Sequence, residues 1–467
     1  MKRYGERVVS PAAIAAGLLL LSLCWGRPVS AQLDTTIQLP TFGVSVDAKG
    51  VVEVKAFPDP DGRLRAQRLA AAEAGLPKDI RKPSPLRKVS LVRLEQAIAR
   101  RVKEGKPLTE PMRFLAGLSQ LQFLFCYPDR GDVIIAGPAE GWIHDAAGRV
   151  IGATTGRPTL RLDDLLIALR SFPPGQDNRP FIGCTIEPGE DGLKRFMEFQ
   201  KTVPGRVRPT ERSQVARNIL EGTRQALGMS EIRVFGIPPT THLAQVMVEA
   251  DFRMKRIGID LEPPPVKMKT FLGALRNPRD GTLQRWWFQP QYECLKTTDD
   301  QLAAELVGQG VQLLSEDLAI GPNGKQLNPT ARVSQASRLY ASTFTKKYPQ
   351  IAAASPVFAQ LRSGINLLVA AAFLQHEDWY ARAGWKMTTL NRPEQLPVAV
   401  LPAPRQVACA VNVTWKGNRL LSPAGGVSLQ PYRALDPMHR VKDDGTVRQT
   451  SDQVRTRHGD DDRWWWD

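Results

Sequence analysis

The clearest pattern of apolar and polar positions runs from Leu121 to Arg170. Two apolar runs flank Asp129-Arg130-Gly131-Asp132, and a second turn at Asp145-Ala146-Ala147-Gly148 leads into Val150-Ile151-Gly152. Glycine and aspartate tolerate the positive φ angles that tight hairpin turns need. The pattern therefore predicts a β-meander followed by an apolar helix, and we interpret this stretch as the nucleus of the main domain.

The strongest single helix is predicted from His242 to Ile257, where apolar residues recur at helical spacing and form one face. Glu249 with Arg253, and Asp251 with Lys255, are acid-before-base pairs four residues apart, and we expect both pairs on the solvated side. Strands and helices alternate from about 120 to 260. The expected fold class is therefore mixed α/β (α+β), a β-meander with helices and additional β-rich and helical segments.

Proline-rich and charged segments divide the chain into five expected parts. Alternating residues in Thr41–Asp47 and Val51–Phe57 predict a leader hairpin, and the run Leu367–Leu374 is apolar all round, which indicates a buried helix. The last residues are mostly polar and charged, a composition typical of disorder. The parts are a signal peptide (1–31), a leader hairpin with a basic Pro-rich linker (32–88), a mixed α/β core domain (89–265), a β-rich segment with a buried helical block (266–432) and a disordered charged tail (433–467).

The first residues have the three parts of a secretory signal peptide. Lys2, Arg3 and Arg7 precede the apolar run Ala12–Trp25, and Val29-Ser30-Ala31 supplies the small residues before the cut. An uncleaved anchor is the alternative, but a spanning helix needs about 20 apolar residues and this run is shorter. We therefore expect cleavage after Ala31 and an exported chain, periplasmic or extracellular. No later stretch predicts a transmembrane span, so we expect the mature chain to be soluble.

The formal net charge is +16. The expected signal peptide contributes a net +3, which leaves +13 and suggests contact with an anionic surface. The basic residues form small scattered groups, and no platform of interleaved aromatic and basic residues is present. We therefore expect an envelope component or another protein as partner, and no nucleic acid.

Four cysteines follow the expected cleavage site: Cys126, Cys184, Cys294 and Cys409. An even, sparse set in an exported chain permits two disulfides. Cys126 and Cys184 both fall in predicted strands of one domain, so they are the first pair to test. Single buried thiols, which behave as small hydrophobic groups, are an equal alternative.

The common catalytic and cofactor motifs are missing from the sequence. It contains no His-Glu-x-x-His, no Gly-x-Ser-x-Gly elbow and neither type of phosphate-binding glycine loop. His376-Glu377-Asp378 offers possible ligands, but adjacent side chains point in different directions, which favours a surface turn. We therefore expect no metal site and no cofactor.

Carboxylate chemistry needs no local motif, so it stays open. Glu140 lies beside Trp142, and an exposed acid next to an aromatic ring is typical of sugar-binding clefts. We take Arg130, Glu140, Trp142 and Arg157 as a candidate ligand-facing rim on two loops. The leading hypothesis is a ligand- or partner-binding protein of the periplasm or cell envelope. The alternative is a carboxylate-dependent hydrolase that acts on glycan or peptide, with Glu140 as the acid.

Three segments together resemble a family of exported proteins seen chiefly in planctomycete bacteria. They are GDVIIAGPAEGW (131–142), TGRPTLRLDDLLIALR (155–170) and VEADFRMKRIGIDLEPPP (248–265). The similarity covers roughly residues 90 to 430. It implies export and a shared domain in an envelope setting. The family has no established activity, so the resemblance assigns no catalytic residue.

Overall fold

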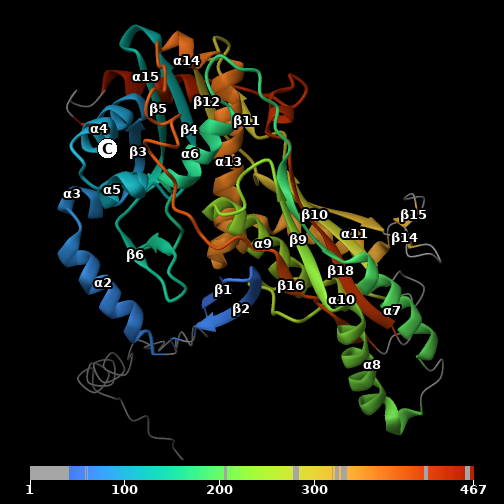
Figure 1. Ribbon diagram of the computed structural model, residues 1–467. Coiled ribbons are helices and arrows are strands. Elements are labelled where there is room, and N and C mark those ends of the chain that lie inside the picture. Colours follow the sequence, from blue (N-terminus) through green and yellow to red (C-terminus); the bar gives the residue numbers. More distant parts are fainter. Residues whose placement is uncertain are drawn as a thin grey trace, which may run out of the picture. The chain divides into compact units, whose positions relative to one another are not determined.

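Two large β-sheets and the helices packed on them form the protein (Figure 1). The computed structural model describes residues 41–467 apart from 58, 60, 204–207, 277–282, 318, 321–325, 328–333, 415–418 and 458–462. The expected signal peptide and the first residues of the leader lie outside this part of the chain. The described residues confirm the mixed α+β fold class.

Among the residues that the structure describes, the first sheet has nine strands in the order β1-β2-β16-β9-β8-β18-β10-β13, with β17 paired to β18. The leader hairpin is confirmed, because β1 and β2 pair antiparallel from Thr41 opposite Phe57 to Val46 opposite Val52. Strands from before residue 88 and from both sides of residue 265 share this sheet, so neither expected boundary separates one sheet from the next. The strands are β1 (Thr41–Val46), β2 (Val51–Phe57), β8 (Ile182–Pro188), β9 (Met229–Phe235), β10 (Leu283–Pro290), β13 (Val311–Asp317), β16 (Gln406–Ala408), β17 (Asn412–Thr414) and β18 (Arg419–Leu429).

The second sheet has seven strands in the described part of the chain, in the order β19-β11-β12-β4-β5-β3-β20. They are β3 (Ser84–Ser90), β4 (Phe123–Tyr127), β5 (Asp132–Ala139), β11 (Leu295–Thr297), β12 (Ala303–Leu306), β19 (Val441–Lys442) and β20 (Trp465–Trp466). The predicted hairpin between β4 and β5 is confirmed, and Gly131 in its turn has a φ of 58°. The meander does not continue beyond it, because β6 (Trp142–His144) and β7 (Val150–Gly152) pair with each other in a separate two-stranded sheet. A further small sheet joins β14 (Ala319–Ile320) to β15 (Gln326–Leu327).

Two of the helices that cover these sheets begin after a residue whose hydroxyl caps the helix. Ser90 caps α4 by accepting a hydrogen bond from the Arg93 amide, and Thr241 caps α9 in the same way. The remaining α-helices are α2 (Arg63–Gly75), α3 (Lys78–Arg81), α5 (Glu110–Arg113), α6 (Leu162–Ser171), α7 (Glu190–Thr202), α8 (Arg212–Leu227), α10 (Phe271–Ala274), α11 (Gln335–Lys346), α12 (Tyr348–Ala354), α13 (Pro356–His376), α14 (Trp379–Arg382) and α15 (Thr446–Thr456), with α4 at Leu91–Lys103 and α9 at His242–Gly258. Short 3₁₀ helices are η1 (Leu115–Gly117), η2 (Pro128–Arg130), η3 (Pro209–Glu211) and η4 (Pro431–Leu435).

Helix α13 is the buried helix predicted around Leu367–Leu374. It packs against α6, α9 and η4, and almost all of its side chains from Val357 to Leu374 are buried (Figure 1). By length and composition it could cross a membrane, but its apolar stretch lies mostly inside the protein. That environment is the one expected of a core helix rather than of a lipid-facing span.

The expectation that both ion pairs of α9 lie on its solvated side is wrong. Both pairs exist, but they are buried. Lys255 Nζ donates to Asp251 Oδ2 at 2.7 Å and also to the carbonyl oxygens of Ile186 (3.1 Å) and Gly425 (3.0 Å). Glu249 lies 3.5 Å from Arg253 Nη1 and also pairs with Arg149. Helix α9 is covered on one side by β8 and β18 and on another by α13, so its charged residues face protein.

The segments expected as a linker and as a disordered tail both contain helices and strands. The expected linker contains α3 and β3, and the tail expected to be disordered contains β19, α15 and β20. Strand β20 pairs antiparallel with β3, and Trp465 and Trp466 are buried. The composition of the tail was misleading because its few apolar residues close one edge of the sheet, and Val447 and Val454 of α15 cover one of its faces.

Each of the four cysteines is a buried free thiol. Cys126 lies in β4 and Cys184 in β8, which belong to different sheets. Burial raises the pKa of the Cys126 and Cys294 thiols to about 12. The structure therefore corresponds to the alternative in which the cysteines act as small apolar groups.

Candidate functional site

The structure does not gather the four residues of the expected rim. Arg130 precedes β5 and Glu140 follows it, so the length of an eight-residue strand, roughly 25 Å, separates them. Arg130 and Arg157 are exposed, whereas Glu140 and Trp142 are 4% and 2% exposed. None of the cavities described below is lined by any of these four residues.

Glu140 stabilises a loop. Its carboxylate accepts hydrogen bonds from the Thr154 amide (2.8 Å), the Thr155 amide (3.1 Å) and the Thr155 hydroxyl. A Cβ atom at Gly152 would lie 2.0 Å from Glu140 Oε1, so the glycine makes room for the carboxylate. The expectation of an exposed acid is therefore wrong, since this carboxylate is enclosed and already has three donors.

The largest cavity among those described is a polar groove of about 590 Å³. It lies where the loop after α6, the end of α13 and the segment of η4 meet. Its lining combines amides, carboxylates, guanidinium groups and one tyrosine ring: Phe172, Gln176, Asp177, Asn178, Arg179, Ala372, Gln375, His376, Tyr432, Arg433, Leu435, Asp436 and Pro437.

The loop after α6 is held in place by the neighbouring helices. Pro173-Pro174-Gly175 ends α6, and Gly175 has a φ of 72°, which glycine adopts without strain. Gln375 Nε2 donates to the Pro173 carbonyl at 2.8 Å, and Tyr380 donates to the Phe172 carbonyl at 3.0 Å. These contacts fix the start of the loop that carries Gln176, Asn178 and the ion pair between Asp177 and Arg179.

His376, at the end of α13, lies beside a charged pair. Its Nδ1 is 2.9 Å from Glu377 Oε1, and Arg440 Nη2 donates to the same oxygen at 2.6 Å. A hydrogen bond to that carboxylate needs a proton on Nδ1, which leaves Nε2 of the neutral ring as an acceptor. Within the described part of the chain, no three His, Cys, Asp or Glu side chains are close enough to hold a metal ion.

The opposite wall of the groove is also fixed by polar contacts. The Arg433 guanidinium stacks over the Tyr292 ring with Cζ 4.7 Å from its centroid. Tyr432 is half-buried, and its hydroxyl is 3.4 Å from Gln430 Oε1. Asp436 Oδ1 accepts the Met438 amide at 2.9 Å. The groove therefore has two carboxylates and two guanidinium groups, so its fixed charges balance.

A second cavity, of about 470 Å³, has a more apolar lining. Leu162, Leu166 and Leu396 form part of it, and Lys106, Arg113 and Arg161 add cationic groups. Arg161 is already paired with Asp163 at 3.4 Å. This cleft offers fewer convergent hydrogen-bonding groups than the polar groove, which is the better match to a specific ligand site.

Sequence reasoning missed the polar groove because three separate segments build it. The residues from 172–179, 372–376 and 432–437 share no local motif. The local signals nearby are the Pro-Pro-Gly turn at 173–175 and His376-Glu377-Asp378, which from sequence alone we interpret as a surface turn. Their meeting depends on the packing of α13 against both α6 and η4. Long-range packing of this kind is not visible in local periodicity.

The comparisons with known proteins concern a different region of the chain. A model of the family described as protein of unknown function (DUF1598) matches residues 184–271. No curated protein and no solved structure matches the chain. The matched segment begins in β8, includes α7, α8, β9 and α9, and ends at Phe271, so the polar groove lies outside it. Residues 184–271 are therefore similar to the DUF1598 domain, a domain of unknown function.

Proposed function

We propose that this chain is an exported ligand-binding protein of the cell envelope and that its ligand is a glycan bound in the polar groove. The observation that carries the proposal is the lining of the groove. Amide, carboxylate and guanidinium groups converge there around a half-buried tyrosine ring. Export rests on the expected signal peptide and on the resemblance to exported proteins.

The charges of the groove favour an uncharged polar ligand. Asp177 and Arg179 neutralise each other through two hydrogen bonds of 3.2 Å, and Arg433 and Asp436 also balance. A strongly anionic or cationic ligand would find no matching field in such a site. Hydroxyl groups both donate and accept hydrogen bonds, so they suit planar amides and carboxylates.

Tyr432 supplies the apolar surface that a sugar ring needs. An aromatic ring offers a large rigid face together with a polar end, and it loses little conformational entropy on binding. The cavity volume of about 590 Å³ falls within the usual range for small-ligand sites, so a short oligosaccharide segment fits.

The hydrolase alternative finds less support in this groove than binding does. A glycosidase needs a general acid in an environment that keeps it protonated, opposite a second carboxylate. Asp177 is largely exposed and paired with Arg179, and Asp436 accepts a backbone amide. Neither carboxylate is enclosed by apolar side chains, and Glu140 is occupied elsewhere.

The test is binding of residues 32–467 to an array of neutral and anionic oligosaccharides, followed by calorimetry of those retained. We expect neutral oligosaccharides to bind, and Tyr432→Ala to weaken the affinity about tenfold through loss of the aromatic face. Leu64→Ala is the matched control, because Leu64 is an exposed apolar residue on α2 that does not line the groove. Absence of any retained glycan, or equal affinity of Tyr432→Ala and wild type, would contradict the proposal.

Two further measurements separate the parts of the proposal. The first is mass spectrometry of a bound oligosaccharide during incubation with the protein. Shortening of the oligosaccharide would favour a hydrolase over a binding protein. Amino-terminal sequencing of the protein recovered from an envelope fraction tests export, and we expect Gln32 as the first residue. Recovery in the cytoplasm with Met1 still present would contradict it.

A further inference from the structure

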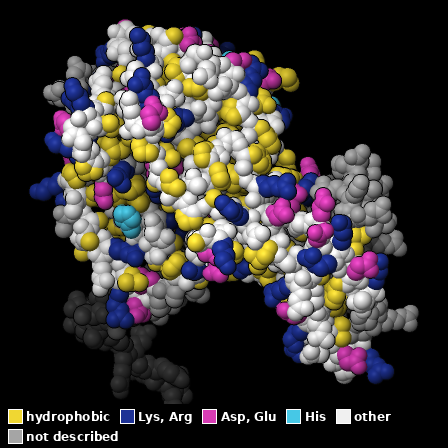
Figure 2. All heavy atoms as spheres, viewed as in Figure 1, with side chains coloured by type: hydrophobic (Ala, Val, Ile, Leu, Met, Phe, Trp, Pro, Cys, Tyr) yellow, Lys and Arg dark blue, Asp and Glu magenta, His cyan; other side chains and the backbone are white. Residues whose placement is uncertain are grey.

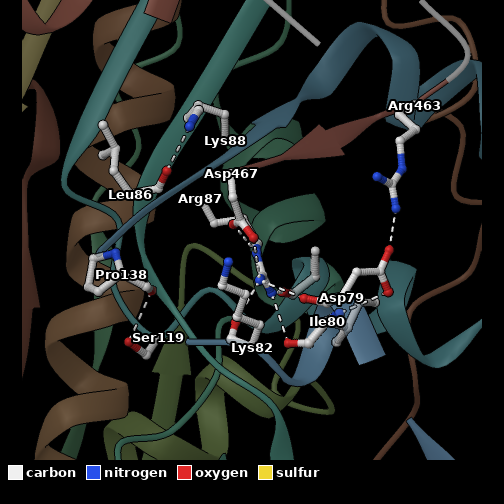
Figure 3. Close-up of polar contacts among 11 residues, drawn as sticks. Asp79, Ile80, Lys82, Leu86, Arg87, Lys88, Ser119, Pro138, Arg463 and Asp467 are labelled. Atoms are coloured by element: carbon white, nitrogen blue, oxygen red, sulfur yellow. Dashed lines mark hydrogen bonds and ion pairs between the residues drawn. The ribbon is translucent and has the colours of Figure 1, made fainter. Parts of the chain in front are cut away.

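Strand β3 carries two adjacent basic side chains that are both buried. Arg87 is 0% exposed and Lys88 is 7% exposed. Successive residues of a strand point to opposite faces, so the two side chains enter different environments (Figure 3). The contrast between these environments identifies a site that the polar groove does not include.

Arg87 has a complete set of partners. Its Nε and Nη2 donate to the two carboxylate oxygens of Asp467 at 2.8 and 3.0 Å. Its remaining hydrogen bonds go to the carbonyl oxygens of Ile80, Ala116, Asp79 and Lys82. Asp467 is therefore committed to Arg87 rather than available to Lys88.

Lys88 lacks such a set. An ammonium group has three donors, and within the described part of the chain Nζ has one hydrogen-bond acceptor, the Leu86 carbonyl at 3.0 Å. No carboxylate of the described residues forms an ion pair with it. Burial lowers the pKa of Lys88, and Arg457 and Arg87 add to this effect against the attraction of Asp467. A buried cation in this situation gains most from an anion that reaches it.

A cavity of about 280 Å³ lies beside Lys88. We call it the β3–α15 pocket, because its lining comes from the segment of β3 and from α15. It brings Lys82, Lys88 and Arg457 together with Asp467. Three cationic side chains line the pocket, and the one carboxylate side chain beside them is already bound to Arg87, so the side chains of the lining carry an excess of positive charge.

We infer that the β3–α15 pocket binds a phosphate group, free or on a small phosphomonoester, with Lys88 as its principal ligand. Phosphate carries close to two negative charges at neutral pH and several acceptor oxygens, which match the excess charge and the spare donors of Lys88. Arg457 adds a guanidinium group at the same pocket. The small volume and the low exposure of Lys88 select a compact anion.

The site is tied to the order of the tail. Lys88 pairs with Trp466 across β3 and β20, and Asp467 lines the pocket. Neutralising Lys88 removes a buried repulsion beside this strand, so phosphate binding raises the thermal stability of the whole chain. The inference is independent of glycan binding, because the pocket and the polar groove share no residue.

The experiment is equilibrium dialysis of the full chain against radioactive inorganic phosphate, with thermal melts in phosphate and in chloride at equal ionic strength. Glycerol phosphate and vesicles that contain phosphatidylglycerol are the two further arms, and they distinguish a soluble source from a lipid headgroup. Lys88→Met removes the charge while keeping an apolar side chain of similar length, so it is expected to fold. Lys442→Met is the matched control, because Lys442 is an exposed lysine of the same sheet.

We expect one phosphate per chain, a melting temperature raised by phosphate over chloride, and affinity at least tenfold lower in Lys88→Met with no change in Lys442→Met. Binding of phosphatidylglycerol vesicles that requires Lys88 would assign the phosphate to a lipid headgroup. Equal binding by wild type and Lys88→Met, or a stabilisation that chloride reproduces, would overturn the inference. Wild-type protein that binds none of the three phosphate probes would overturn it as well.

Discussion

Loss of the Arg87 guanidinium group should weaken the attachment of the tail (433–467) more than any other single change considered below. It is fully buried and bonds both the Asp467 carboxylate and four main-chain carbonyl oxygens. Arg87→Met leaves two of those acceptors, on the buried residues Ile80 and Ala116, without a donor, at about 1–2 kcal/mol each. Loss of the charge-assisted pair with Asp467 adds about 1 kcal/mol. We therefore expect a loss of about 4 kcal/mol in the free energy of unfolding.

Two companion variants divide this loss between the carbonyl oxygens and the carboxylate. Asp467→Asn keeps the guanidinium on all four carbonyl oxygens, and the Asp467 side chain is 38% exposed, so we expect a loss of about 1 kcal/mol. Arg87→Lys supplies three donors in place of five and should lie between the other two variants. Trp465 should lose packing in Arg87→Met, because the guanidinium lies 4.7 Å from its ring centroid.

The assay is urea unfolding at pH 7, with amide hydrogen exchange as a local readout. The Ser90 amide donates to the Trp464 carbonyl at 2.9 Å, so its exchange reports whether the tail stays attached to β3. We expect faster exchange there in Asp467→Asn, with little change in the nine-stranded sheet. An unfolding free energy of Arg87→Met within about 1 kcal/mol of wild type would refute the reasoning, as would equal losses in Arg87→Met and Asp467→Asn.

The ion pair between Arg87 and Asp467 also determines the direction in which the stability of the fold changes with pH. Burial alone would raise the pKa of Asp467, but hydrogen bonds from Arg87 and Ser84 and the charges of Arg87 and Lys88 outweigh it and lower the pKa. An acid whose pKa is lower in the folded than in the unfolded state stabilises the fold at pH values above its unfolded-state pKa, about 3.9 for aspartate. This stabilisation is lost as the pH falls through the folded-state pKa. The difference in stability between wild type and Asp467→Asn should therefore shrink below about pH 4.

Four further outcomes follow from the geometry. Glu140→Ala should lower the unfolding free energy by about 2 kcal/mol, because two amides and a hydroxyl lose their acceptor, and an unchanged melting temperature would contradict this role. Gly425→Ala should prevent accumulation of folded protein, since its φ is 111° and a Cβ would lie 1.9 Å from the Trp286 carbonyl oxygen; soluble, folded variant would count against it. A thiol reagent at pH 8 should leave the cysteines of residues 32–467 unmodified until denaturant is added, when four thiols should react. Burial raises the pKa of Asp251 to about 6, so between about pH 4 and pH 6 the folded state holds a proton that the unfolded chain has released. The wild type should therefore lose stability as the pH rises through this window, and Asp251→Asn should gain stability relative to it. Urea midpoints of both proteins at about pH 4.5 and pH 7 measure this difference.

Local patterns predicted the elements whose neighbours lie close in the sequence. The β1–β2 and β4–β5 hairpins follow from alternation and turn residues, and α9 follows from apolar residues at helical spacing. The tail escaped prediction because its order depends on a strand almost 380 residues away. Trp465 pairs with Val89, and no property of the last residues alone indicates that edge. Composition measures the average hydrophobicity of a segment, whereas a sheet edge needs only a few correctly placed residues.

The candidate site was missed for a related reason. Sequence proximity of Glu140 to an aromatic residue indicated an exposed acid, but it does not determine which way the carboxylate points. In the structure the carboxylate points to amides of the loop 14 and 15 residues further on. The groove instead combines the loop after α6 with the end of α13, about 200 residues further on, and with the segment of η4. It forms only because α13 packs against both α6 and η4.

The buried charges of α9 show why a charged pair predicts a partner better than it predicts exposure. Spacing of four residues correctly indicated that Asp251 and Lys255 would meet. The spacing did not determine whether the pair is exposed to solvent. The Lys255 ammonium group has two further donors, and the carbonyl oxygens of Ile186 and Gly425 accept hydrogen bonds from them inside the protein. Lys255 thereby links α9 to both β8 and β18 through directional hydrogen bonds. A hydrophobic side chain at this position would pack on the two strands without fixing where they lie. This helix lies within the segment matched by the DUF1598 model, where Asp251 and Lys255 serve to orient the helix on the sheet.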